Sequence, residues 1–90
     1  MSDIKITKEK IDYLMDTADY EVITAFEKCT IVTARLKNGF ILTESSACVD
    51  PKNYDLELGI KYAKAKIRER LWELEGYALQ KAVHKLTEEL

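Results

Sequence analysis

The chain has 90 residues, with 14 Lys and Arg against 16 Asp and Glu and a formal net charge of −2. This length allows one small domain spanning residues 1–90, and the balanced charge excludes a strongly basic nucleic-acid-binding protein. Hydrophobic residues make up 47% and charged residues 33%, which is typical of a folded chain rather than a disordered one. Because so short a chain buries only about two-thirds of its unfolded surface, dimerisation would add useful stability.

The sequence lacks the signals of export and of membrane insertion. No run of about 18 apolar residues is present, and residues 1–9 mix acidic with basic side chains. We therefore expect a cytoplasmic protein, with no membrane contact, in which Cys29 and Cys48 are reduced. Two cysteines and one histidine are too few for an ordinary four-ligand zinc site, so neither a metal nor another cofactor is expected.

The N-terminal third predicts a short helix followed by an ambiguous segment. Ile11, Leu14 and Met15 form one apolar stripe at helical spacing, and this helix should end within residues 16–19. Residues 20–26 mix β-branched and aromatic side chains with Glu and Ala. They fit either the end of that helix or a first strand.

The middle of the chain predicts a β-hairpin. Residues 29–36 are rich in Thr, Val and Ile, and they are followed by Asn38-Gly39, the pair that a two-residue type I′ turn requires. Such a turn would place Lys37 opposite Phe40 and would fix the pairing of every residue further along the two strands.

This register also assigns the two faces of the hairpin. Cys29 would lie opposite Cys48 in a hydrogen-bonded pair whose side chains diverge, so free thiols are expected rather than a disulfide. One face would carry Val32, Ala34, Leu36 and Ile41, and the other Ile31, Phe40 and Leu42 with Arg35 and Glu44. Neither face is wholly polar. We therefore expect helices on one face, and a third strand, a partner or a second protomer shielding part of the other.

A turn at Pro51 leads into a helical C-terminal third. Pro51 cannot continue a strand, and it follows Asp50, a good helix cap. Apolar residues then recur every three or four positions, which predicts helix. One unbroken helix over residues 55–88 would be about 50 Å long, so two helices that break near Gly76 are favoured. The alternative is a single straight helix that projects and dimerises.

Together these elements predict an α+β fold. It would contain a short N-terminal helix, an antiparallel hairpin with an Asn-Gly turn and room for a third strand, and two C-terminal helices packed on the sheet. Trp72 and Tyr77 flank the expected break and are predicted to fill the core there, with Tyr13, Tyr20 and Tyr54 in the same wall. Stacking of an aromatic ligand on these rings is the alternative.

One helical stretch is strongly basic. Residues 61–70 hold five basic side chains and one acid, and Lys61, Lys64 and Arg68 share one face at helical spacing. A basic strip of this kind is what phosphate binding needs. A solvated helix surface is the plainer interpretation.

A second group of candidate residues follows the hairpin. Asp50, Asn53 and Asp55 are spaced closely enough to hold a divalent cation, but they lack the calcium-loop pattern, and capping of helices is the favoured role. Cys48 would need a base to act as a nucleophile, and the only imidazole, His84, lies far along the chain. With no catalytic constellation present, an enzyme is not expected.

Several short motifs occur in a definite order. They are Leu-Lys-Asn-Gly-Phe at residues 36–40, Ser-Ala-Cys-Val-Asp-Pro at 46–51, Asn-Tyr-Asp at 53–55, Gly59, and Leu-Trp-Glu-Leu-Glu-Gly-Tyr at 71–77. Over residues 22–80 this order resembles a family of small tailed-phage and prophage proteins, named after gene product forty-nine of one phage and gene product sixty-six of another. The family commonly carries a proline after the tryptophan, where this chain has Glu73.

The resemblance implies a phage or prophage origin, expression inside a bacterial cell, and an accessory role outside the virion shell. It implies no reaction. Our first hypothesis is therefore a non-enzymatic protein that binds a host protein or a second copy of itself as a homodimer. The alternative is a module that binds a small phosphorylated ligand, a nucleotide or nucleic acid. We expect a functional surface where residues 50–55 meet the basic strip, since a helix N-terminus and cations both favour anions.

Overall fold

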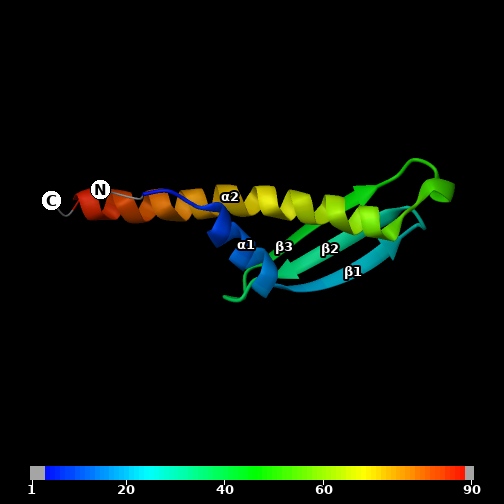
Figure 1. The fold of residues 1–90 in the computed structure, drawn as a ribbon, viewed down its shortest axis with the longest axis horizontal. Helices are drawn as coiled ribbons and strands as arrows, with labels where there is room; N and C mark the ends of the chain where they lie inside the picture. Colours follow the sequence, from blue (N-terminus) through cyan, green and yellow to red (C-terminus); the bar gives the residue numbers. More distant parts are fainter. Residues whose placement is uncertain (1–3, 89–90) are drawn as a thin grey trace.

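The computed structural model describes residues 4–88 and has an α+β fold (Figure 1). Helix α1 (Lys8–Thr17) precedes strands β1 (Asp19–Ala25), β2 (Cys29–Arg35) and β3 (Ile41–Ala47), a short 3₁₀ helix η1 (Pro51–Asn53) and helix α2 (Leu56–Glu88). The three strands form one antiparallel sheet in the order β1-β2-β3. The ambiguous segment 20–26 is therefore a strand, which supplies the third member of the sheet.

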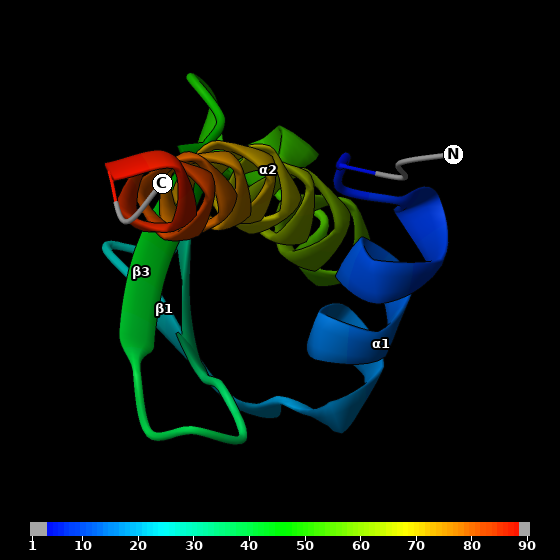
Figure 2. The ribbon, with the colours of Figure 1, turned by 90° about the vertical axis from the view of Figure 1, so that its left-hand side faces the viewer.

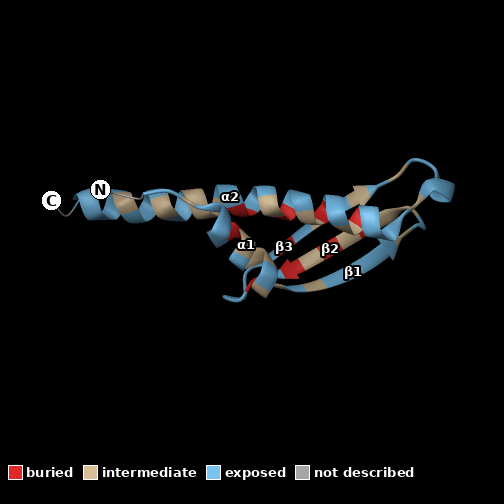
Figure 3. Ribbon diagram, in the orientation of Figure 1, coloured by how far each residue is buried: buried red, intermediate tan, exposed pale blue. Residues whose placement is uncertain are grey.

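Both helices contribute to one core on one face of the sheet (Figures 2 and 3). Its buried side chains come from α1, from the sheet with its hairpin loop, and from α2: Ile11, Val32, Ala34, Leu36, Leu42, Ala63, Ile67 and Leu71. Along β2 the buried residues alternate with less buried ones, as expected for a strand with one covered face. The opposite face carries Ile23 and Ile41, which are 58% and 54% exposed.

The register of the β2–β3 hairpin differs by one residue from the expected register. Ala34 pairs with Leu42 and Arg35 with Ile41, because the connecting loop has three residues rather than two. Within this loop Gly39 has a φ of 95°, and its N–H donates to the Leu36 carbonyl at 2.8 Å. The two-residue turn was therefore a wrong prediction, although the hairpin itself is present.

This one-residue shift reverses which side chains face the core. Leu42 is buried, whereas Ile41, which was expected on the covered face, is exposed. Burial of the leucine against the helices favours this register over the one that the Asn-Gly pair alone would select. Cys29 lies opposite Ala47 rather than Cys48, and both cysteines are free thiols.

Helix α2 runs unbroken from Leu56 to Glu88, so the prediction of two helices divided near Gly76 was wrong. A Cβ built on Gly76 would meet nothing within 4 Å, which means that no close packing depends on this glycine. A glycine costs only about 1 kcal/mol inside a helix. Ending the helix there would leave several carbonyl groups without partners. The long helix gives the molecule extents of 60 × 23 × 19 Å.

The aromatic residues do not form the expected common wall. Trp72 and Tyr77 lie on the surface of α2, exposed by 38% and 69%, because there is no helix break for them to fill. Tyr13 is exposed on α1, Tyr20 stands at the start of β1, and Tyr54 follows η1.

Helix α2 approaches the sheet closely at Gly59. A Cβ on Gly59 would come within 2.0 Å of Thr30 Oγ1 and 2.7 Å of Thr30 Cβ. Thr30 is fully buried, and its hydroxyl lies 2.7 Å from the Tyr54 hydroxyl, which in turn lies 2.9 Å from Thr24 Oγ1. The buried hydroxyl is therefore hydrogen-bonded, and the missing side chain at Gly59 sets the distance between helix and sheet.

Helix α1 is fastened to α2 by polar contacts as well as by the core. The Arg68 guanidinium donates to one oxygen of Asp12, and Lys8 donates to the other at 2.8 Å. Lys10 and Glu75 form a further ion pair at 3.8 Å. The hydrogen bonds from Lys8 and then Arg68 hold the pKa of the Asp12 carboxyl below its ordinary value.

Replacing each of the two glycines of α2 with alanine should have opposite effects on the free energy of unfolding. Gly59→Ala should destabilise the fold by about 1–3 kcal/mol, because the new methyl group overlaps Thr30. Gly76→Ala should stabilise it by about 1 kcal/mol, since it meets open space and improves helix propensity. Urea unfolding followed by circular dichroism measures both. Equal effects of the two substitutions would contradict this account of the helix–sheet contact.

Asp12→Asn should lower the free energy of unfolding at neutral pH. Because the carboxyl pKa is lowered in the folded chain, its contribution is present above the unfolded value near 3.9 and is lost as the pH falls through the folded value. Urea titrations between about pH 7 and about pH 2 should therefore show the difference from wild type disappearing in acid. Asp16→Asn, an exposed change on the same helix, is the control. A pH-independent difference would refute the assignment.

Candidate functional site

Three segments that are distant in the sequence meet at one end of the molecule (Figure 1). They are the β1–β2 turn (residues 26–28), the connection from β3 to α2 (residues 48–55) and the first two turns of α2. We call this end the corner. It contains all four residues of the predicted functional corner: Cys48, Asp50, Asn53 and Asp55.

Hydrogen bonds between the two loops hold the corner together. The Cys48 N–H donates to the Lys28 carbonyl at 2.9 Å, and the Lys28 ammonium donates to the Val49 carbonyl at 3.4 Å. The Cys48 thiol donates to the Asp50 carbonyl at 3.3 Å. The position of the connection is therefore tied to the β1–β2 turn, which is more than twenty residues away in the sequence.

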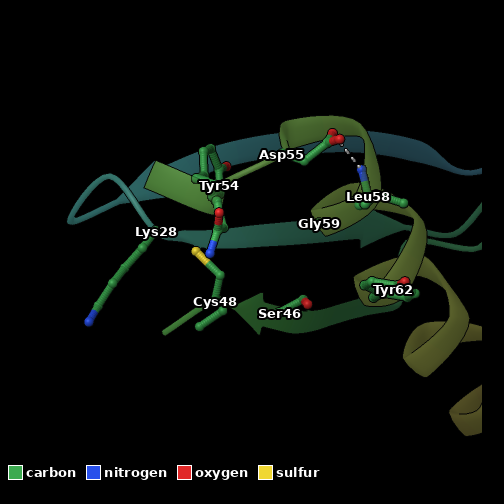
Figure 4. Close-up of a pocket in the computed structure, with 10 residues that line it drawn as sticks. Lys28, Ser46, Cys48, Tyr54, Asp55, Leu58, Gly59 and Tyr62 are labelled. Carbon is green, nitrogen blue, oxygen red and sulfur yellow. Dashed lines mark hydrogen bonds between the residues drawn. The ribbon is translucent and has the colours of Figure 1, made fainter. Parts of the chain in front are cut away.

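Both aspartates of the corner cap a helix. Asp50 Oδ1 accepts from the Lys52 N–H at 2.9 Å at the start of η1, and Asp55 Oδ1 accepts from the Leu58 N–H at 3.2 Å at the start of α2 (Figure 4). A carboxylate thus already occupies the N-terminus of α2, where an anionic ligand would otherwise bind. Within residues 4–88, no group of three or more His, Cys, Asp or Glu side chains is placed to hold a metal ion.

A shallow pocket of about 200 Å³ opens between these segments (Figure 4). Its lining consists of Lys28, Ser46, Ala47, Cys48, Asn53, Tyr54, Asp55, Leu58, Gly59 and Tyr62. Pockets for small-molecule ligands usually measure about 300–1,000 Å³. This one has room for a single inserted side chain rather than for a cofactor.

Cys48 and His84 lie at opposite ends of the molecule. Cys48 stands beside the start of α2, whereas His84 lies near the end of that helix and pairs with Glu88 at 3.5 Å. His84 lies twenty-eight positions beyond Leu56, which corresponds to roughly 40 Å of helix. The imidazole therefore cannot serve as a base for the thiol of the same chain.

The basic strip lies along α2, next to α1. Lys64 is placed over the Tyr20 ring, 4.1 Å from its centroid, and Arg68 is paired with Asp12. Lys61 is exposed. Two of the three predicted anion-binding side chains are thus already engaged in fastening α1 and β1 to α2, and the strip does not share the pocket of the corner.

The most unusual feature of the corner was not anticipated from the sequence. In the turn between β1 and β2, Phe26 and Glu27 have φ values of 53° and 58°, and the Lys28 N–H donates to the Ala25 carbonyl at 3.2 Å. Such a turn normally takes Asn, Asp or Gly. Phe26 is 90% exposed and Val49, in the adjacent loop, is 93% exposed. Because neither Phe nor Glu is typical of a positive φ, the amino-acid sequence does not predict this turn.

The remaining predicted motif residues lie elsewhere. Asn38 and Gly39 form the loop at the other end of the β2–β3 hairpin, where Asn38 Oδ1 accepts from the Phe40 N–H at 3.0 Å. Trp72, Gly76 and Tyr77 lie in the C-terminal half of α2. The structure therefore does not bring these residues into the corner.

Comparison with known proteins gives one family. The model of the Phage protein (N4 Gp49/phage Sf6 gene 66) family matches residues 6–83, which include α1, the whole sheet and most of α2. Neither the curated proteins nor the solved structures gave a match. Neither of the two helices in the described part of the chain combines the length with the apolar character needed to cross a membrane. The resemblance seen in the motifs is thus confirmed over most of the chain, which belongs to the Phage protein (N4 Gp49/phage Sf6 gene 66) family.

Proposed function

We propose that this phage protein is a non-enzymatic accessory protein that acts in the cytoplasm of the bacterial host by binding a host protein at the corner. The observation that carries the proposal is Phe26. This residue is 90% exposed, and its backbone has a left-handed φ of 53°. Both features cost free energy in the isolated chain, which points to a role in contact with another molecule.

The cost of presenting Phe26 has two parts. A left-handed backbone costs a residue with a Cβ about 1–2 kcal/mol, more than Gly would incur at the same position. Leaving the ring in water forgoes a further 1.5–3 kcal/mol or so of burial. Exposed, rigidly held aromatic side chains are typical anchors of protein–protein interfaces.

The surroundings of Phe26 suit a protein partner. Val49 is 93% exposed in the neighbouring loop, and Ile23 and Ile31 pair with each other on the open face of the sheet close by. Glu27, Lys28, Asp50 and Lys52 lie in the same two loops and carry both signs of charge. Exposed apolar side chains beside charges of both signs suit a protein partner that has an apolar cleft, rather than a polyanion.

The substitution Phe26→Asn should change partner binding and folding stability in opposite directions. Asparagine favours the left-handed turn, so this variant should be more stable than wild type by about 1 kcal/mol. It removes the ring, and we expect at least about tenfold weaker binding of the host protein. The measurement is a pull-down with the tagged full chain from bacterial lysate, followed by mass spectrometry, titration of the captured protein, and thermal unfolding of each variant.

Two controls make the pull-down specific. Phe40→Ala removes another exposed phenylalanine, in the loop at the other end of the sheet, and should leave capture unchanged. Nuclease treatment in parallel removes proteins held through nucleic acid. Undiminished capture by the Phe26→Asn chain would refute the proposal. Capture lost with nuclease and with Lys61→Glu would instead support the alternative, a nucleic-acid-binding role of the basic strip.

A further inference from the structure

Strand β1 forms one margin of the sheet, and its outer side meets no other strand of the described chain. In Figure 1 it runs along the lower side of the molecule, away from α2, which packs over β2 and β3. Val22 and Ile23 are 40% and 58% exposed. All seven residues of β1 pair with β2 in one continuous register. A regular, exposed edge of this kind is a place where another strand can add to the sheet.

The backbone of β1 presents a definite row of polar groups at this edge. In the β2–β3 ladder the Leu36 N–H donates to the Phe40 carbonyl, so the even-numbered residues of β2 bond to β3 and the odd-numbered ones to β1. The partners of these odd-numbered residues in β1 are also odd-numbered. The even-numbered residues of β1 therefore direct their N–H and C=O groups outward: Tyr20, Val22 and Thr24. The backbone of an added strand matches such a row.

The opposite edge of the sheet, along β3, is obstructed by α2. The Lys66 ammonium donates to the Ser45 carbonyl at 2.7 Å, and Arg70 pairs with Glu44 at 3.4 Å. By the same alternation, the Ser45 carbonyl is one of the groups that β3 directs outward. A lysine placed on an edge hinders pairing with another chain. The two edges therefore differ, and the edge of β1 is the one suited to an added strand.

Charge at this edge favours a basic strand over a second copy of β1. Asp19 pairs with Arg35 at 2.9 Å, whereas Glu21 is exposed and belongs to none of the ion pairs within residues 4–88. Two β1 strands paired antiparallel along their full length would meet at Val22 and place their Glu21 side chains diagonally, about 7–8 Å apart, where the charges repel. Parallel pairing in register would bring these two carboxylates side by side. A lysine or arginine opposite Glu21 attracts it instead.

We propose that the host protein adds an extended strand to the edge of β1, with a lysine or arginine opposite Glu21 and apolar side chains beside Val22 and Ile23. This inference rests on the proposed function, because it specifies how the partner at the corner binds. Phe26 follows directly after β1, so the anchor and the edge adjoin each other. The added strand supplies backbone hydrogen bonds, and Phe26 enters the adjoining cleft of the partner.

Proline substitutions at the two edges test the added strand. Val22→Pro removes an outward N–H that no bond to β2 uses, so the fold should be retained by circular dichroism while binding weakens at least about tenfold. Thr43→Pro removes an outward N–H from β3 and is the matched control, with unchanged affinity expected. The measurement is titration of the purified host protein that the wild-type chain captures. Undiminished binding by a folded Val22→Pro chain, or an equal loss with Thr43→Pro, would overturn the proposal.

Charge reversal tests the basic side chain of the added strand. Glu21→Lys should weaken binding of the same host protein at least about fivefold, because it replaces attraction by repulsion. Glu73→Lys makes the same change at an exposed position on α2 and should leave the affinity unchanged. Equal effects of the two reversals would overturn the assignment of a basic strand.

Amide hydrogen exchange tests the edge without any substitution. In the free wild-type chain the Val22 and Thr24 amides should exchange faster than those of Glu21 and Ile23, which bond to β2. Binding of the captured host protein should slow exchange at Val22 and Thr24 at least about tenfold. Unchanged exchange at these amides would overturn the added strand even if Val22→Pro fails to fold. Slow exchange there in the free chain at high concentration would indicate a second copy and would also overturn it.

The two proposals fail in different ways. Loss of binding with Phe26→Asn but not with Val22→Pro would overturn only the added strand. Loss with Val22→Pro but not with Phe26→Asn would overturn the assignment of Phe26 as the anchor. A wild-type chain that captures no host protein would refute both.

Discussion

The fold depends on the direct contact between Gly59 and Thr30. A helix normally keeps its distance from a sheet through the side chains between them, and here the helix has none at the crossing point. The close approach seals Thr30 from water, which in turn requires the Tyr54 hydroxyl as its hydrogen-bond partner. Tyr54 belongs to the connection that leads into α2. This one contact therefore fixes the distance of α2 from the sheet and the path of the connection. It also fixes the positions of Gly59 and Tyr54, which line the pocket.

The position of the corner follows from this contact. Since α2 begins only a few residues before Gly59, the connection must cross the end of the sheet beside the β1–β2 turn. A backbone hydrogen bond from the Cys48 N–H to the Lys28 carbonyl then holds the two loops together. Phe26 and Val49 therefore lie on two loops that hydrogen bonds hold in place. A rigid anchor loses little conformational entropy when it binds, which favours tight association.

The sequence allowed the elements to be predicted better than their exact arrangement. The stripe of Ile11, Leu14 and Met15 correctly predicted α1, and the Thr-, Val- and Ile-rich stretch correctly predicted a strand, because these patterns are local. The hairpin register was missed because burial of Leu42 outweighs the turn preference of Asn38-Gly39. The unbroken helix was only the alternative prediction, because a break at Gly76 was favoured on the expectation that a small domain is compact. The elongated shape of the described chain is instead set by the part of α2 that continues past the sheet.

In the candidate site too, contacts between residues close in the sequence could be predicted, whereas contacts between distant residues could not. Asp50 and Asp55 were recognisable as helix caps, since the atoms involved lie within a few residues of each other. The engagement of Lys64 by Tyr20 and of Arg68 by Asp12 joins residues more than forty positions apart, and no spacing in the sequence indicates it. Phe26 could not be found by pattern at all. Its left-handed backbone follows from the short connection that two paired strands impose on whatever residues lie between them.

Strand β1 is one edge of the sheet, and this has a consequence for how the protein behaves at high concentration. Edge strands with apolar side chains tend to pair with other chains and to aggregate. Here Val22 and Ile23 are exposed along that edge, and the strand contains no proline or lysine. Asp19 and Glu21 are its only charges, and Asp19 is partly offset by Arg35 at 2.9 Å. Glu21 therefore acts as the main gatekeeper against edge-to-edge polymerisation, and substituting it with an apolar residue would endanger solubility more than stability.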